Sequence, residues 1–208
     1  MTSNQIARRG GRGLYHKGRP PLQKTRKNGA TLPEYLELGE VRALLDAAAH
    51  AQARLLFLIQ WRAGLRISEA VALEPADLTL GVDRPTLRVR RGKGRRTRIV
   101  PVHPELAAGL TTALDYARRR PGPIVDISRS TGLRWVKAAV ARATEFGGLR
   151  AGRTIGTHTL RHSYARHLLV NGIPINYVSR WLGHSTLSTT LVYLELVPDP
   201  AGTLAGVP

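Results

Sequence analysis

Residues 158–193, which read HTLRHSYARHLLVNGIPINYVSRWLGHSTLSTTLVY, hold the most informative pattern in the chain. The first part predicts a helix over residues 157–171, with side chains at every fourth position that we expect to face the core: Leu160, Tyr164 and Leu168. His158 and Arg161 lie three residues apart on a different face of that helix. An imidazole and a guanidinium side by side, directed away from the core, suit a phosphate-binding site.

The second part of this stretch predicts helices over residues 175–182 and 186–196. In the latter, residues at spacings of three and four share one face, which we expect to pack on the core: Leu187, Thr190, Leu191 and Leu194. Tyr193 lies about 120° around the helix from Leu187, so we expect its hydroxyl to be free of the core and able to approach a ligand. A phenol has an ordinary pKa of about 10, so a nucleophilic Tyr193 requires nearby positive charge or a base; without them it is an ordinary surface tyrosine.

Cleavage of a phosphodiester without a metal requires a nucleophile, cations that stabilise charge on the non-bridging oxygens, and an acid for the leaving oxygen. This chain can supply all three. A zinc site is the alternative for His158 and His162, which are four residues apart as in metalloprotease helices. Thr159 stands where such helices carry a glutamate, so we expect no metal.

Helical patterns fill most of the remaining chain. The predicted helices cover residues 41–48, 53–63, 65–73, 105–119 and 131–146. Between residues 85 and 102 the apolar period changes to two, and Gly92-Lys93-Gly94 supplies turn residues, which predicts a β-hairpin with Lys93 near its tip. We therefore expect a mainly α fold of the α+β class, with a small antiparallel β-sheet or hairpin.

The charge of the chain favours a polyanionic partner. Its 208 residues suit one domain, and 32 Lys and Arg against 14 Asp and Glu give a net charge of +18, so nucleic acid is the leading partner. The absence of cysteine excludes a disulfide framework, cysteine zinc ligands and a cysteine nucleophile. Because no apolar run suits a transmembrane helix or a signal peptide, we expect no membrane partner and a cytoplasmic location.

The first 30 residues are basic, rich in glycine and free of acidic residues. Such a segment cannot bury enough apolar surface to order itself, so we interpret residues 1–30 as a flexible basic arm that gains structure on DNA. The alternative is that residues 1–30 form a solvated tail without a function. At the other end of the chain, we expect residues 198–208 to form an irregular tail. The phosphate contacts predicted from the arm and the hairpin are Arg8, Arg9, Arg12, Lys24, Arg26, Lys27, Arg91, Arg95 and Arg96.

Several motifs follow one another along the chain in a fixed order. They are Gly64-Leu65-Arg66-Ile67-Ser68-Glu69, Lys93 in its hairpin turn, His158-x-Leu160-Arg161-His162, Leu182-Gly183-His184, and Tyr193 nine residues after that histidine. This set resembles the tyrosine recombinase (phage integrase) family, in which the first piece is an arginine motif and the second a β-strand lysine. The similarity covers about residues 32–196, which implies a helical tyrosine recombinase catalytic domain over residues 31–197.

By this resemblance, Tyr193 attacks the scissile phosphate, forms a 3′-phosphotyrosyl link and releases a 5′-hydroxyl. Arg66 and Arg161 stabilise charge in the transition state, and His184 donates a further hydrogen bond. Attack by a 5′-hydroxyl of a partner strand then reverses the chemistry. The resemblance therefore implies neither ATP nor a metal or other cofactor.

Three further residues take supporting roles by the same resemblance. Lys93 protonates the leaving 5′ oxygen, His158 assists proton transfer at the tyrosine, and Glu69 holds the site in place through a hydrogen bond. The alternatives are an Arg66 that only caps a helix or pairs with Glu69, and a Lys93 that is one of several interchangeable phosphate contacts. We interpret the remaining ring-bearing candidates as structural: His162, His167 and Trp181.

The resemblance also implies partners. We expect double-stranded DNA, self-association into a tetramer on paired DNA sites, and assistance from an accessory DNA-bending protein. Most members carry a DNA-clamping domain before the catalytic domain, where residues 1–30 stand here, so we expect a short form without that core-binding domain. The prolines that follow Tyr193 argue against an exchanged C-terminal helix, although an extended tail could still dock on a neighbour.

The predicted function is therefore site-specific DNA recombination, in integration, excision, inversion or resolution, as carried out by mobile elements. Two alternatives stay open. One is a non-catalytic DNA-binding accessory protein of the same fold, and the other is DNA relaxation by type IB topoisomerase chemistry. A covalent DNA complex at Tyr193 separates the enzymes from the binding protein, and strand exchange separates recombination from relaxation.

Overall fold

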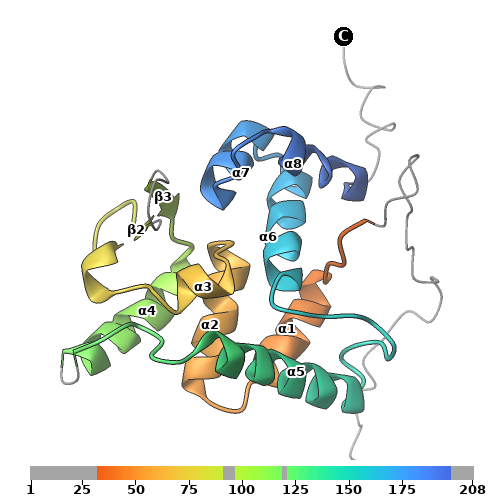
Figure 1. Cartoon of the computed structure of the whole chain (residues 1–208), viewed down its shortest axis with the longest axis horizontal. Helices are drawn as coiled ribbons and strands as arrows, with labels where there is room; N and C mark the ends of the chain where they lie inside the picture. Colours follow the sequence, from red (N-terminus) through yellow and green to blue (C-terminus); the bar gives the residue numbers. More distant parts are fainter. Residues whose placement is uncertain (1–31, 91–96, 119–120, 198–208) are drawn as a thin grey trace, which may run out of the picture. The chain divides into compact units, whose positions relative to one another are not determined.

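The computed structural model describes residues 32–90, 97–118 and 121–197 (Figure 1). Its helices are α1 (Leu38–Asp46), α2 (Ala51–Arg62), α3 (Ile67–Ala70), η1 (Pro75–Asp77), α4 (Pro104–Ala117), α5 (Arg129–Glu145), α6 (Thr159–Val170), α7 (Ile175–Leu182), α8 (Ser188–Leu191) and η2 (Leu194–Leu196). Its strands are β1 (Leu78–Thr79), β2 (Thr86–Val89) and β3 (Arg98–Pro101). Several predicted residues lie outside the described ranges: Lys93, Arg91, Arg95 and Arg96 of the hairpin, Arg8, Arg9, Arg12, Lys24, Arg26 and Lys27 of the arm, and the tail 198–208.

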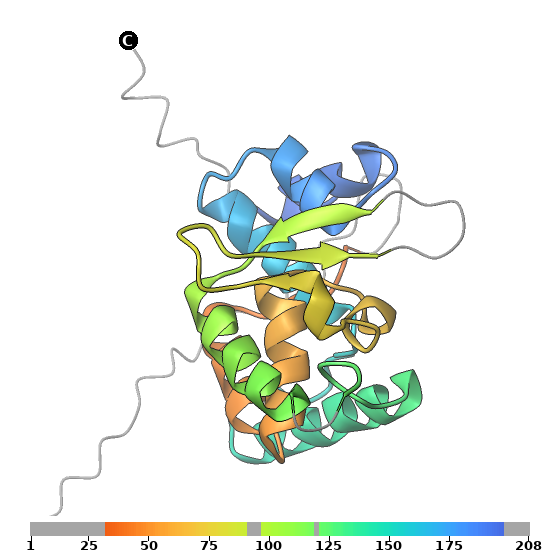
Figure 2. The same cartoon turned by 90° about the vertical axis from the view of Figure 1, so that its left-hand side faces the viewer.

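The strands form an antiparallel sheet in the order β1-β2-β3. Leu87 of β2 pairs with Val100 of β3 and both are fully buried, whereas Ile99 points outward and is 52% exposed. β3 packs against α7, and β2 packs against η1 (Figure 2). The sheet confirms the predicted hairpin pairing, and together with the helices it confirms the mainly α, α+β fold class.

Helix α2 lies at the centre of the core. Leu56, Phe57 and Ile59 are fully buried because this helix is apolar on most of its sides. The helices α1, α4, α5 and α6 all pack against it (Figure 1). The predicted stripe of α6 is also confirmed, since Leu160 and Tyr164 are buried and Leu168 packs against the core.

The helix predicted over residues 186–196 is broken in the structure. A single turn, α8, ends at Leu191, and η2 begins at Leu194 with the tighter 3₁₀ geometry. Of the face predicted to pack on the core, Thr190 is buried as expected. The prediction is wrong for Leu187, Leu191 and Leu194, which are each 45–46% exposed. The residues that turn inward are Thr190, Tyr193 and Leu196.

The predicted helix over residues 65–73 is shorter in the structure, where α3 covers only Ile67–Ala70. The turn at Gly64 delays its start, and Arg66 is its N-cap, with an extended backbone. Within the described ranges, no helix is long and apolar enough to cross a membrane.

Candidate active site

The first arginine motif follows a tight turn after α2. Gly64 has a φ of +64°, and a Cβ at this position would lie 2.5 Å from a ring carbon of Tyr164 and 2.9 Å from a methyl carbon of Leu182. Glycine tolerates both the left-handed conformation and the close approach, so the chain can turn here against α6 and α7. It then reaches Arg66 at the start of α3 and Glu69 within that helix.

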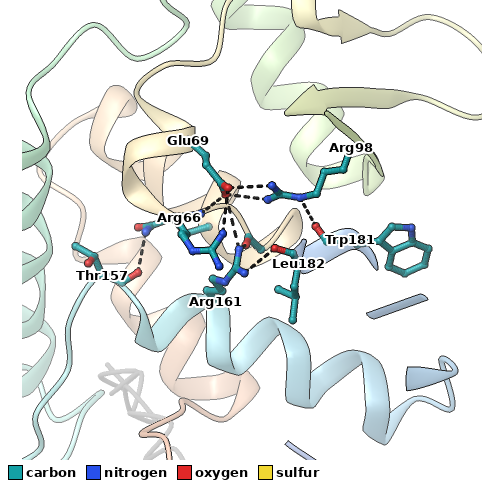
Figure 3. Close-up of polar contacts among 9 residues, drawn as sticks. Arg66, Glu69, Arg98, Thr157, Arg161, Trp181 and Leu182 are labelled. Atoms are coloured by element: carbon teal, nitrogen blue, oxygen red, sulfur yellow. Dashed lines mark hydrogen bonds and ion pairs between the residues drawn. The ribbon is translucent and has the colours of Figure 1, made fainter. Parts of the chain in front are cut away.

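Glu69 is surrounded by three arginines (Figure 3). Its carboxylate accepts two hydrogen bonds from Arg98, at 2.9 and 2.8 Å, and two from Arg66, at 3.2 Å from the side chain and 2.9 Å from the backbone N–H. A nitrogen of Arg161 lies 3.7 Å from the same carboxylate. Burial alone would raise the pKa of Glu69, but the hydrogen bonds and charges of these arginines lower it to about 2. We call Arg66, Glu69, Arg98 and Arg161 the arginine cluster.

Arg98 and Arg161 also fix the end of α7. Arg98 Nε donates to the carbonyl of Trp181 at 2.6 Å, and Arg161 Nη2 donates to the carbonyl of Leu182 at 2.7 Å (Figure 3). The last carbonyls of a helix lack partners inside it and attract positive charge. Gly183 then turns the chain through a left-handed conformation toward His184. The arginine cluster therefore determines where the segment that carries His184 begins.

Arg161 is buried, whereas we expected it to point away from the core. It is 2% exposed, and it donates a second hydrogen bond to the carbonyl of Gly64. The turn at Gly64 and the end of α7 cover this face of α6, and both offer buried carbonyls that need a donor. Burial, together with the charge of Arg66, lowers the pKa of Arg161 to about 10, so the guanidinium remains charged at neutral pH.

The other half of the site, which we call the tyrosine side, consists of His158, His162, His184 and Tyr193. The Tyr193 hydroxyl lies 2.8 Å from Nδ1 of His162. The ring centroids of His184 and Tyr193 are 6.2 Å apart, and Nδ1 of His184 lies 2.7 Å from the hydroxyl of Thr190. Burial, with nearby positive charge adding to it, lowers the pKa of both His162 and His184 to about 4. Both rings are therefore neutral at neutral pH.

His158 precedes α6 as its N-cap residue, and the centroid of its ring lies 6.3 Å from that of His162, with the two ring planes inclined by 30°. Burial and the charges of Arg161 and Arg66 lower its pKa. In the described part of the chain, the side chain that touches the Tyr193 hydroxyl is that of His162. The ring that we interpreted as structural is thus the one in contact with the nucleophile candidate.

Tyr193 is buried, so the expectation of a hydroxyl free of the core is wrong. The residue is 3% exposed, because the break between α8 and η2 turns its ring toward α6. Burial raises the pKa of its hydroxyl, and the charges of Arg161 and Arg66 oppose part of that increase. The phenol therefore has a neutral imidazole in contact and arginine charge nearby, which are the neighbours that a nucleophilic tyrosine requires.

Residues far apart in the sequence thus meet in one site, where a phenol, an imidazole and guanidinium groups lie together. Such a set can bind a phosphate and deprotonate a nucleophile. Among residues 32–90, 97–118 and 121–197, no group of three or more His, Cys, Asp or Glu could hold a metal ion. Arg98 was not predicted, although alternation along its strand places it on the same inward face as Val100.

Comparison with known proteins places this arrangement in a family. Residues 34–198 match the phage integrase family. The tyrosine recombinase XerA of Thermococcus onnurineus (strain NA1) is 35% identical over 189 residues, which cover 88% of this chain and 64% of that protein. This chain thus spans less than two thirds of that relative's length.

Solved structures agree with the sequence match. The crystal structure of XerA recombinase superimposes with a TM-score of 0.70 at 25% identity, over 83% of this chain and 64% of that one. XerH site-specific recombinase, bound to a palindromic difH substrate in a post-cleavage complex, gives a TM-score of 0.66 at 25% identity, over 85% and 53% of the two chains. With its fold, the order of its motifs and most of its length in agreement, this chain belongs to the phage integrase family.

Proposed function

We propose that this chain is a site-specific DNA recombinase that cleaves and rejoins DNA through a 3′-phosphotyrosyl link at Tyr193. The observation that carries the proposal is the 2.8 Å contact between the Tyr193 hydroxyl and Nδ1 of His162, beside the charges of Arg161 and Arg66. A phenol held against a neutral base and near cations is prepared for nucleophilic attack. The similarity to XerH, a site-specific recombinase solved with its difH substrate, supports the same function.

In the proposed cleavage, the phenolic oxygen of Tyr193 attacks phosphorus while the neutral His162 accepts the phenolic proton. The new bond leaves the 3′ end of the strand on the tyrosine. The bond from phosphorus to the 5′ oxygen breaks, and Lys93 supplies the proton that makes this oxygen a hydroxyl. His158, whose ring lies near that of His162, assists the proton transfer.

The same proposal assigns the groups that stabilise the pentavalent phosphate. Arg66, whose side chain is 35% exposed, contacts the non-bridging oxygens, and the buried Arg161 adds positive charge behind it. In the proposed tautomer, the hydroxyl of Thr190 is the donor in its 2.7 Å contact with Nδ1 of His184, so that the ring carries its proton on Nε2 for a hydrogen bond to the phosphate. Glu69 keeps the arginines in place without touching the phosphate.

Rejoining reverses these steps with a 5′-hydroxyl from a partner strand, so the energy of the broken bond is kept in the phosphotyrosyl link and no ATP is required. We propose double-stranded DNA as the substrate, held by the basic residues of the arm and the hairpin, and a tetramer on two paired sites, with an accessory DNA-bending protein as a further partner. The proposed place of action is the cytoplasm, where such DNA would be found.

The test traps the covalent intermediate. The substrates are a set of duplexes with a randomised central sequence, and each duplex carries one nick close to a different possible cleavage position. After cleavage, the short fragment next to the nick diffuses away, so that rejoining fails. The wild-type chain should give a detergent-resistant protein–DNA complex, and Tyr193→Phe should give none. DNA binding without any adduct would contradict an enzymatic function and favour a non-catalytic DNA-binding protein.

A second arm of the test uses the sequence recovered from the trapped DNA. Strand exchange between two copies of that site is the expected result for a recombinase. Relaxation of a supercoiled plasmid with one copy of the site, without exchange between two copies, would indicate a type IB topoisomerase instead.

A further inference from the structure

Helix α6 contacts both the first and the last segments of the described chain. Figure 1 shows both the segment that leads into α1, in red and orange, and the segment after α8, in dark blue, on the same side of this helix. Ser163 holds the first of these segments, because its hydroxyl accepts a hydrogen bond of 2.8 Å from the backbone N–H of Leu36. Arg153 donates to Glu34, Glu40 and the carbonyl of Tyr35 as well. The leading segment, residues 34–37, is therefore firmly attached.

Arg166 of α6 joins this leading segment to the segment that follows Tyr193. Its guanidinium makes a two-pronged contact with the carboxylate of Glu37, both N···O distances being 3.1 Å, and lies 4.4 Å from the ring centroid of Tyr35. Its Nε donates to the carbonyl of Leu196 at 3.0 Å. The side chain is 15% exposed, although that of Glu37 is 59% exposed. One guanidinium thus contacts both segments at once.

The segment after Tyr193 has little regular structure to hold it. Its 3₁₀ helix covers only Leu194–Leu196, and two of its backbone hydrogen bonds return to Tyr193 and Leu194. His162 and Arg166 are four residues apart on α6 and therefore share a face. The first contacts the hydroxyl of Tyr193 and the second contacts the backbone three residues later. These two side chains therefore hold the segment that carries the nucleophile at both of its ends, at Tyr193 and at Leu196.

We propose that Arg166 is a positioning residue for the nucleophile, which it serves by fixing the backbone after Tyr193 to the leading segment. This inference rests on the proposed function of Tyr193. Reaction rates fall steeply when a nucleophile is displaced by about 1 Å, so loosening of this segment should slow cleavage more than it weakens DNA binding. A displacement of the leading segment would also shift the backbone after Tyr193, because Arg166 contacts both segments.

The experiment compares Arg166→Met and Arg166→Lys with the wild-type chain. In Arg166→Met, the rate of adduct formation on the trapped site, measured in a single turnover, should fall by about tenfold to a hundredfold. The dissociation constant for the same DNA should change by less than about threefold, as expected for a side chain already engaged with the protein. Arg166→Lys keeps the charge but lacks the planar fork, so it cannot bind Glu37 and Leu196 together, and its rate should lie between the other two.

The matched control is Arg118→Met, which removes one arginine from the end of α4. The side chain of Arg118 is 80% exposed, and the contact described for it is an ion pair with Asp115. Its cleavage rate should equal that of the wild type. Cleavage by Arg166→Met at the wild-type rate would overturn the inference. A loss of cleavage rate that is matched by an equal loss of DNA affinity would also overturn it.

Amide hydrogen exchange gives a readout that does not depend on activity. The amides of Leu196 and Val197 should exchange faster in Arg166→Met than in the wild type, while those of α2 stay protected. If the wild-type chain forms no adduct on any DNA, the proposed function fails, and exchange alone then decides whether Arg166 holds this segment. Unchanged exchange at Leu196 and Val197 would refute the role of Arg166 whatever the activity.

Discussion

The arginine cluster and the tyrosine side of the site are built in different ways. In the arginine cluster, Glu69 alone accepts four hydrogen bonds from Arg66 and Arg98, and further arginine donors are engaged by the carbonyls of Gly64, Trp181 and Leu182. On the tyrosine side, single contacts join a hydroxyl to an imidazole, at Tyr193 and at Thr190. The elements that carry Tyr193 are also short.

The difference shows which part of the proposed chemistry is prepared in advance. Groups that stabilise charge act best when they are already fixed, because they then need no reorganisation during the reaction. A buried nucleophile has to turn its side chain toward the phosphate, and one hydrogen bond holds the Tyr193 hydroxyl, while Arg166 keeps the backbone after it in place. We therefore expect mutations in the arginine cluster to affect stability and catalysis together, and mutations on the tyrosine side to affect mainly catalysis.

The largest effect on stability is expected for Arg98→Met. Removal of one partner leaves the carboxylate of Glu69, whose side chain is 12% exposed, with fewer compensating charges, and breaking such a buried pair typically costs about 3 to 5 kcal/mol. Urea denaturation measures the free energy of unfolding. The double variant Arg98→Met/Glu69→Gln should recover part of this loss. A loss below about 1 kcal/mol in the single variant Arg98→Met would show that the arginine cluster is not a stabilising unit.

Arg161→Lys should slow adduct formation by about 10²-fold, the loss that follows when a mutation misplaces reacting groups by about 1 Å. Lysine keeps the charge but cannot reach the carbonyls of Gly64 and Leu182 together from one planar fork. Single-turnover cleavage of the trapped site measures the rate. Arg54→Lys, at an arginine whose side chain is 44% exposed, is the control and should cleave normally. A rate for Arg161→Lys within about threefold of the wild type would show that cleavage does not require the planar fork of this residue.

The pH dependence of stability should report Glu69. Its pKa is about 2 in the folded chain and 4.5 without the fold, so its contribution is complete above about pH 4.5 and is lost as the pH falls toward 2. The shift corresponds to about 3 kcal/mol of folding free energy. Between pH 5 and pH 2, the free energy of unfolding should fall less steeply in Glu69→Gln than in the wild type. Parallel curves would mean that Glu69 is not held as a carboxylate by the arginines.

A smaller effect is expected on the tyrosine side, where His162→Gln should lower the cleavage rate by about tenfold to a hundredfold, near the low end for loss of a general base. Its thermal stability should change little, since glutamine can still contact the Tyr193 hydroxyl. His167→Gln is the matched control, because His167 is on the same helix and its ring packs against Trp61 instead. Equal rates for both variants and the wild type would remove His162 from the chemistry.

Much of the fold follows directly from the sequence. The periodicity of α2 and α6 predicts their buried faces, and the alternation of Leu87 and Val89 with arginines predicts the hairpin. Long elements are predictable because many side chains contribute to one pattern. The break at residues 192–193 is not predictable, since the spacing of Leu187, Leu191 and Leu194 suits a continuous helix. Only tertiary contacts show that Tyr193 turns inward.

In the site, too, some features follow from local sequence patterns and others depend on tertiary contacts. The motifs that contain Arg66, Arg161, His184 and Tyr193 can be read from local spacing, and the structure brings these residues together. The role of Arg98 depends on strand pairing and on the position of α7, which lie far away in the sequence. An inward-facing arginine on a short strand was the available signal. The contact of His162 with Tyr193 likewise depends on how η2 returns to α6.

The most direct test of the central claim is to identify the residue that becomes linked to DNA. After trapping and nuclease digestion, trypsin cleaves after Arg180, and no Lys or Arg follows in the sequence, so the peptide that begins at Trp181 contains Tyr193 as its one tyrosine. Mass spectrometry should find the remnant nucleotide on this peptide, attached to Tyr193 through its 3′-phosphate. A remnant on any other residue, or one attached through a 5′-phosphate, would contradict the account.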